Sequence, residues 1–193
     1  MLGRVPRRLV SAVVAIAVAC GPTAATLAGT DLGSGEAPDI TLTDGRTASP
    51  LALSSLRGKV VVLTFLYTRC PDVCPLTAER FRVTQRELGA DADGVVFVAV
   101  STDPDHDTPE AVQAFSRAHG LDRNWHYLIG SRSQLAAVWQ AYGIVANPDP
   151  GLPTVTHTDA VYLIDRRGRE RVLLRTDALD EVLLNDLRIL TAE

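Results

Sequence analysis

Residues 60–77 read VVVLTFLYTRCPDVCPLT, an apolar run that ends abruptly at two cysteines. Residues 60–67 are rich in β-branched and aromatic side chains and show no polar alternation. Such a run is typical of a central strand that is covered on both faces. The sequence therefore predicts a buried strand that ends directly before Cys70 and Cys74.

A rough amphipathic helix is predicted after the cysteines. Residues 76–88 place apolar side chains among charged ones, at Leu76, Ala78, Phe81, Val83 and Leu88. Asp72, Pro71 and Pro75 are residue types that suit a helix start. At a strand-to-helix turn the positive end of the helix dipole lowers the pKa of a thiol and favours the thiolate. Because the thiolate attacks disulfides and binds metal ions, Cys70 and Cys74 are candidate reactive residues.

The spacing of these cysteines leaves more than one chemistry open. In a regular helix the Cβ atoms of residues i and i+4 are roughly 5–6 Å apart, whereas a disulfide requires about 3.8 Å. A disulfide thus needs local distortion, while two thiolates flanking a soft metal ion fit the wider gap more easily. Two buried, unreactive cysteines are the third interpretation, since cysteine is a common core residue.

The first 19 residues are typical of an export signal. Three arginines lie within residues 1–8, and residues 9–19 contain Ser11 as their one polar residue. This run is too short to span a bilayer core of about 30 Å as a helix, so it indicates a signal peptide. Residues 17–21 resemble a bacterial lipoprotein processing site, with Cys20 as the lipid-modified first residue of the mature chain. A plain secretory signal and an uncleaved anchor are the alternatives.

The rest of the chain is predicted to contain a tether and one domain. Residues 20–38 are rich in small residues and are expected to form a flexible tether, followed by one folded domain at residues 39–193. With Cys20 lipidated, one cysteine pair remains and no stray thiol is left in an oxidising compartment. Removal of residues 1–19 takes away three arginines, so the formal charge becomes 16 minus 23, or −7. This charge argues against nucleic acid as a partner.

Strands and helices alternate along this domain. Strands are predicted at residues 40–43, 94–102 and 125–129, in the latter half of 154–165, and in a hairpin with its turn at 165–168 and its second strand at 171–174. Helices are predicted from Thr108 and Pro109 onward, at 131–142 and at 179–190. Residues 147–153 are typical of a turn-rich loop. This order predicts an α/β fold in which helices cover both faces of a mixed sheet.

The remaining acidic and imidazole groups do not form a recognisable metal motif. Asp103, Asp105 and Asp107 alternate as in a calcium loop, but Thr108 and Ala114 stand where that loop needs Gly and Glu. Other histidines have no cysteine or second histidine at ligand spacing, and solvated or capping roles are predicted for them: His106, His119 and His126.

Three segments together resemble the Sco/SenC family of copper chaperones. They are CPDVCP at residues 70–75, DPDHDTPE at residues 103–110, and His157 just before a predicted strand. The resemblance extends from about residue 40 to the C-terminus and implies a thioredoxin-like fold, tethered to the outer side of the cytoplasmic membrane. It also implies Cys70, Cys74 and His157 as copper ligands, and delivery of copper to the CuA-bearing subunit of cytochrome c oxidase. The family often has an acidic residue before the histidine, where this chain has Thr156, so a role for that acidic group is not carried over.

The donor types support the same three ligands. Two thiolates are soft ligands suited to Cu(I), and an imidazole lets the site accept Cu(II) as well, although zinc also fits on ligand type. Three protein ligands leave the site open, which suits a carrier that takes copper from another donor and hands it over.

The alternative is an enzyme, a thiol-disulfide oxidoreductase that keeps a partner's cysteines reduced and depends on a thiol reductant. The three-residue spacer between Cys70 and Cys74 argues against a general oxidoreductase, as does the absence of proline from residues 154–165. A peroxidase is a third option, but Tyr67 and Pro71 stand where a threonine is expected three residues before the attacking cysteine.

Overall fold

The computed structural model describes residues 26–148, 151 and 154–193. Within them an eight-stranded mixed sheet has the strand order β1-β10-β9-β4-β5-β6-β2-β3. Its strands are β1 Thr30–Asp31, β2 Thr41–Asp44, β3 Ser49–Ala52, β4 Val60–Leu66, β5 Val95–Ser101, β6 Trp125–Ile129, β9 Val161–Ile164 and β10 Glu170–Leu174. β4 and β6 are parallel to β5, whereas β9 is antiparallel to β4. The predicted mixed sheet is confirmed.

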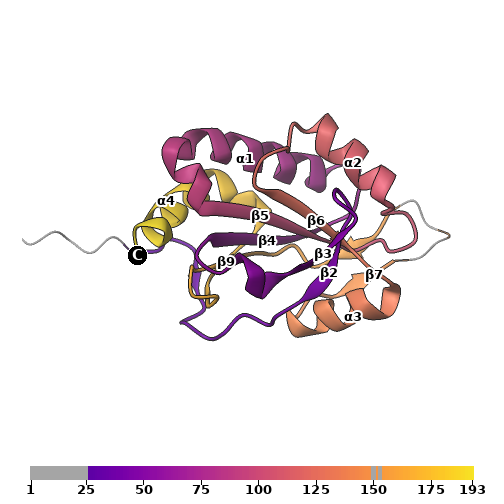
Figure 1. Ribbon diagram of the computed structural model, residues 1–193, viewed down its shortest axis with the longest axis horizontal. Coiled ribbons are helices and arrows are strands. Elements are labelled where there is room, and N and C mark those ends of the chain that lie inside the picture. Colours follow the sequence, from indigo (N-terminus) through magenta and orange to yellow (C-terminus); the bar gives the residue numbers. More distant parts are fainter. Residues whose placement is uncertain (1–25, 149–150, 152–153) are drawn as a thin grey trace, which may run out of the picture.

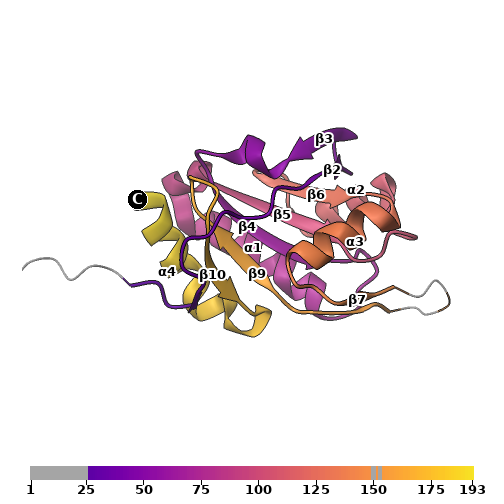
Figure 2. The same ribbon diagram turned by 90° about the horizontal axis from the view of Figure 1, so that it is seen from below.

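Helices cover both faces of this sheet. They are α1 Val73–Leu88, α2 Pro109–Ala118, α3 Arg132–Ala141 and α4 Leu179–Ala192, with the 3-10 turns η1 Leu53–Leu56, η2 Gly89–Gly94 and η3 Thr176–Ala178. α1, α2 and α4 lie on one side of the sheet and α3 on the other (Figure 1), which Figure 2 shows from below. The predicted α/β class is confirmed. None of the helices in the described ranges is long and apolar enough to cross a bilayer.

Two layers of buried side chains hold the helices on the sheet. Val60 and Val62 of β4 pack in the layer that contains α1 and α4, while Val61 and Leu63 pack in the layer that contains α3. Every residue of β4 and β5 is buried, as expected for strands covered on both faces. β4 is therefore a rigid support for the residues that follow its carboxyl end.

Local capping explains where two of the predicted helices begin. Thr108 precedes α2 and accepts the Ala111 N–H at 3.3 Å, with Pro109 as the first helical residue. Ser131 precedes α3 and forms a capping box with Gln134. Both starts agree with the sequence prediction, because each depends on side chains within three residues of the cap.

The stretch predicted to be a flexible tether is partly bound to the domain. Thr30–Asp31 pairs with β10 as an edge strand, and the N–H groups of Ala28 and Gly29 donate to the buried carboxylate of Asp186 at 2.8 and 3.0 Å. A Cβ on Gly29 would lie 2.2 Å from Leu174 Cδ2, so this close approach requires glycine. Residues 28–31 of the predicted tether are therefore bound to the domain, because β10 and Asp186 offer their backbone hydrogen-bond partners. Residues 20–25, Cys20 and the leader lie outside the described residues.

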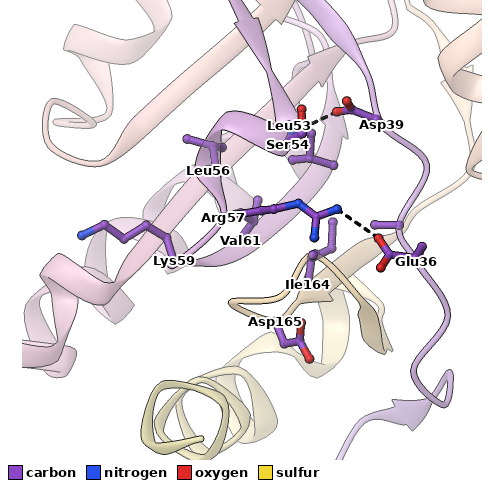
Figure 3. Close-up of a pocket in the computed structure, with 12 residues that line it drawn as sticks. Glu36, Asp39, Leu53, Ser54, Leu56, Arg57, Lys59, Val61, Ile164 and Asp165 are labelled. Carbon is purple, nitrogen blue, oxygen red and sulfur yellow. Dashed lines mark hydrogen bonds and ion pairs between the residues drawn. The ribbon is translucent and has the colours of Figure 1, made fainter.

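A small cavity of about 120 Å³ lies at the amino end of β4, away from the cysteines (Figure 3). The N-terminal segment forms part of its wall, where Glu36 pairs with Arg57 at 3.1 Å and Asp39 accepts the Ser54 N–H at 2.9 Å. Its apolar lining residues are Ala37, Leu53, Leu56, Val61 and Ile164. The cavity thus belongs to the end of the sheet where the N-terminal segment docks.

Candidate metal centre

The cysteine loop begins where β4 ends, at the carboxyl edge of the parallel part of the sheet. The Thr102 N–H, directly after β5, donates to the Leu66 carbonyl at 2.8 Å. One turn later the Cys70 N–H donates to the Tyr67 carbonyl at 3.3 Å. Loops after adjacent parallel strands meet at this edge, where α/β proteins commonly place their sites.

The start of α1 differs from the prediction in two ways. Asp72 stands at the N-cap, but its side chain makes no capping bond; the Cys70 sulfur accepts the Cys74 N–H at 3.3 Å instead. Pro75, the third helical residue, has no N–H group, so the first turn of α1 has one backbone donor fewer that needs a capping acceptor. Cys70 also lies outside the helix, three residues before Val73, so the i and i+4 distances of a regular helix do not apply to the pair.

The two thiols are free and have different environments. Cys74 is fully buried, whereas Cys70 is partly exposed. The hydrogen bond from Cys74, with the N–H groups of Asp72 and Cys74, lowers the pKa of Cys70 to about 5. The same bond and burial raise the pKa of Cys74 far above its ordinary value. The pair thus shares one proton, which stays on Cys74, and the negative charge lies on Cys70 at the helix N-terminus.

A buried carboxylate holds the loop that precedes Cys70. Asp107 Oδ1 accepts both the N–H and the hydroxyl of Thr68, at 2.8 and 2.7 Å. Asp107 Oδ2 accepts the hydroxyls of Ser101 and Tyr127, at 2.6 and 3.2 Å. Burial raises the pKa of Asp107, although these hydrogen bonds oppose the shift. The sequence analysis placed Asp107 in a failed calcium motif and in the family segment at residues 103–110 but missed this role, because its donors come from three separate segments.

His157 lies on a hairpin that the sequence analysis did not predict. β7 Ala146–Asn147 pairs with β8 Thr156–His157 in a separate two-stranded sheet, so the predicted turn-rich loop is the connection of this hairpin. His157 Nδ1 lies 3.0 Å from the Thr158 carbonyl. This partner can only accept, so Nδ1 carries the proton and Nε2 is the nitrogen with a free lone pair.

The aromatic ring of Tyr67 connects the hairpin to the cysteine loop. The rings of Tyr67 and His157 meet edge to face, with centroids 5.9 Å apart and planes at 88°. The structure thus brings Cys70 and Cys74 together and places His157 beside the residue where the cysteine loop begins. No three histidine, cysteine or acidic side chains in the described ranges are close enough to hold a metal ion as they stand. Joint coordination by the three predicted ligands therefore requires their side chains to move closer together than they lie here.

The other histidines have local partners. His106 Nδ1 lies 2.8 Å from Asp103 and 2.6 Å from Arg69. His126 Nδ1 lies 2.9 Å from Asp44, and the His119 ring packs on Phe115. His119 stands at the C-cap of α2, in agreement with one of the predicted roles, whereas His106 and His126 form polar pairs with aspartates and are partly exposed.

The fold and the site together define a thioredoxin-like protein with a dithiol at a helix N-terminus and a nearby histidine hairpin. The chain matches the family model described as SCO1/SenC over residues 37–192 and belongs to that family. The Sco/SenC resemblance and the thioredoxin-like fold inferred from the sequence are confirmed. Sco proteins of this family bind copper and are linked to cytochrome c oxidase assembly.

Individual relatives agree with this assignment. The SCO1 protein homolog of Bacillus subtilis is 31% identical over 130 residues, which span 65% of this chain and 65% of the relative. The chain thus aligns with slightly less than two thirds of that protein. The apo Sco1 protein of Thermus thermophilus has a TM-score of 0.73 at 29% identity, covering 84% of this chain and 96% of the other. The copper-bound ScoI of Bradyrhizobium japonicum has a TM-score of 0.71 at 30% identity, covering 82% and 99%.

Proposed function

We propose that this protein is a copper chaperone that holds one copper ion between Cys70, Cys74 and His157. The observation that carries the proposal is the pair of free thiols at the start of α1, with the charge on the more exposed sulfur. Two sulfur donors and one imidazole match Cu(I), and Cu(II) when the imidazole takes part. The copper-bound relative from Bradyrhizobium japonicum supports copper as the cargo.

The geometry gives each ligand a separate role. Cys70 is partly exposed and charged, so it is the first sulfur that an incoming copper ion meets. Cys74 is buried and binds as a thiolate only after it loses its proton, so full coordination releases a proton. His157 offers Nε2 from a short hairpin, and its departure is the simplest way to open the site for transfer.

The target that we propose is the CuA-bearing subunit of cytochrome c oxidase, in line with the family's link to oxidase assembly. We also propose that Cys20 carries a lipid that anchors the protein on the outer face of the cytoplasmic membrane. Anchoring raises the local concentration of the carrier near a membrane-bound target without a new contact. Mass spectrometry of the membrane-extracted protein tests the anchor: an acylated N-terminal Cys20 supports it, and another mature N-terminus contradicts it.

Copper affinity of single variants tests the ligand set. We expect Cys70→Ser and Cys74→Ser to lose tight Cu(I) binding, and His157→Ala to weaken Cu(II) binding more than Cu(I) binding, since Cu(II) favours a nitrogen ligand. Competition with a chelator measures both affinities, on reduced protein for Cu(I). Full retention of both affinities in His157→Ala would remove His157 from the site. The matched control is His119→Ala, because His119 packs on Phe115 in α2.

A second candidate function is reduction of a partner's disulfide, which the arrangement of one exposed and one buried thiol favours. In this reaction the Cys70 thiolate attacks one sulfur of the partner disulfide and displaces the other as a thiolate. Cys74 then loses its proton and attacks Cys70, which releases the second partner thiol and leaves a Cys70–Cys74 disulfide. A thiol reductant must reduce this disulfide before the next cycle. Two results together would favour the enzyme. Disulfide exchange would need both cysteines, and His157→Ala would change neither disulfide exchange nor copper affinity.

A further inference from the structure

Tyr67 contacts both parts of the candidate centre. It directly follows β4, and its side chain is 4% exposed. Its hydroxyl lies close enough to the Cys70 side chain and to the backbone N–H of Val155, two residues before His157, to interact with both. Its ring meets the His157 ring edge to face at 5.9 Å. One buried side chain thus joins the cysteine loop and the histidine hairpin.

Among the described residues, the backbone-to-backbone hydrogen bonds of the hairpin lie within the hairpin itself. Its pairing consists of Ala146 with His157 and Asn147 with Thr156, and the Thr158 N–H donates to the Val145 carbonyl at 2.9 Å. These interactions shape the hairpin, while Arg132 of α3 donates to the Pro148 carbonyl at 3.2 Å and Val155 is buried in the layer that contains α1. The contacts of Tyr67 run from the hairpin to the cysteine loop itself.

We propose that Tyr67 is a positioning residue that holds the His157 hairpin against the cysteine loop, so that His157 reaches copper bound by the two sulfurs. The ring orients the imidazole through their edge-to-face contact, which is specific in geometry. The hydroxyl interacts with both the Cys70 side chain and the Val155 N–H. Tyr67 touches the ligands and not the metal, so it acts through His157. This inference rests on the proposed three-ligand site.

Two substitutions separate the ring from the hydroxyl. Tyr67→Leu removes both contacts, and we expect it to weaken Cu(II) binding by about 10–100-fold, the range typical of residues that orient a metal ligand. Tyr67→Phe keeps the ring and loses the hydroxyl, so its Cu(II) affinity is expected between those of wild type and Tyr67→Leu. Cu(I) affinity should change less than Cu(II) affinity in both variants, because the sulfurs remain. Tyr162→Phe is the matched control, since its hydroxyl donates to the Tyr142 carbonyl in the layer on the other face of the sheet.

A double-variant comparison distinguishes this proposal from the proposed function. If Tyr67 acts through His157, Tyr67→Leu adds no further loss of Cu(II) affinity in a His157→Ala background. If His157→Ala weakens Cu(II) binding but Tyr67→Leu does not, the role of Tyr67 is wrong and the three-ligand site stands. If His157→Ala changes neither affinity, the three-ligand site itself fails. Additive losses in the double variant would also contradict a role through His157.

Two measurements on the copper-free protein guard against general loss of fold. Circular dichroism should show a folded domain for Tyr67→Phe and Tyr67→Leu. The imidazole resonances of His157 should shift in Tyr67→Leu and stay close to wild type in Tyr67→Phe and Tyr162→Phe, because the ring contact persists there. Unchanged His157 resonances in Tyr67→Leu would overturn the proposal without any reference to copper. If Tyr67→Leu does not fold, Tyr67→Phe decides: wild-type copper affinities and unchanged Cys70 resonances would remove the hydroxyl's role.

Discussion

Asp107 and Asp165 are buried aspartates at opposite ends of the sheet, and their pKa values shift in opposite directions. Asp107, beside the cysteine loop, accepts hydrogen bonds from neutral groups of Thr68, Ser101 and Tyr127, and burial raises its pKa. Burial also acts to raise the pKa of Asp165, but hydrogen bonds from Arg169 and from the Arg167 N–H outweigh it and lower the pKa. A carboxylate with a cationic partner is a stabilising element, whereas one held by neutral groups retains an unbalanced charge.

The two ends of the sheet differ in how their charges are paired. At the amino end of β4, the turn around Asp165 and the docked N-terminal segment close the sheet with ion pairs. At the carboxyl end, Asp103 and Asp105 form ion pairs, but the donors to the Asp107 carboxylate and to the Cys70 sulfur are neutral groups. A site with excess negative charge favours a cation such as copper, and the closed end does not.

The largest expected effect is the loss of copper binding when a cysteine at the carboxyl end of β4 is substituted. Cys70→Ser or Cys74→Ser should weaken Cu(I) binding by at least about 100-fold, which is the upper end of effects seen for residues that only orient ligands. Asp165→Asn should leave Cu(I) affinity unchanged, because it alters the opposite end. Chelator competition on reduced protein checks both. A comparable loss of affinity in Asp165→Asn would show that the two ends do not act separately.

The same substitution at the two aspartates should have unequal effects on stability. Asp165→Asn removes the charge that pairs with Arg169, which should lower the free energy of unfolding by about 1.5–3 kcal/mol. Asp107→Asn should change it by less than about 1 kcal/mol. Its amide oxygen can accept from Thr68 while its NH₂ group donates to the hydroxyl oxygens of Ser101 and Tyr127. Urea unfolding at neutral pH measures both free energies of unfolding. A larger loss of stability in Asp107→Asn than in Asp165→Asn would contradict this prediction.

A glycine in the N-terminal segment tests whether docking there stabilises the domain. Gly29→Ala places a Cβ against Leu174 and should lower the free energy of unfolding by roughly 1–3 kcal/mol. Gly35→Ala is the matched control, since a Cβ at Gly35 meets nothing within 4 Å. Thermal unfolding followed by circular dichroism compares the two variants. Equal melting temperatures would mean that the segment contributes nothing, as a flexible tether would.

The smallest expected effect is the pH dependence of stability. Because the folded-state pKa of Asp165 is lowered, its contribution is present above its unfolded value of 3.8 and is lost as the pH falls through the folded value. Wild type and Asp165→Asn should therefore converge in stability below about pH 3.8. For Asp107, whose folded pKa is raised, stability falls as the pH rises from 3.8 through the folded value. Asp107→Asn should thus gain relative to wild type as the pH rises, and urea unfolding at a series of pH values measures both trends.

Local features of this chain were predictable from its sequence. The strand at residues 60–67 and the α2 and α3 starts follow from side-chain type and spacing, because their determinants lie within a few residues of one another. The thiol pair was recognisable as a candidate reactive pair for the same reason, since a strand followed closely by a helix places both cysteines near the helix N-terminus. The donor types of Cys70, Cys74 and His157 also come directly from residue identity.

Only the tertiary structure decided how these groups differ. The hydrogen bond between the two thiols, together with the burial of Cys74, shifts their pKa values in opposite directions, and both depend on packing across the whole layer. Asp107 takes its donors from three other segments, and the N-terminal segment binds β10 and α4, which lie about 140 residues or more further along the chain. The neighbour of His157 is Tyr67, 90 positions earlier in the sequence. Such contacts depend on the register and packing of distant elements, so the sequence determined the chemistry available and the fold determined which groups meet.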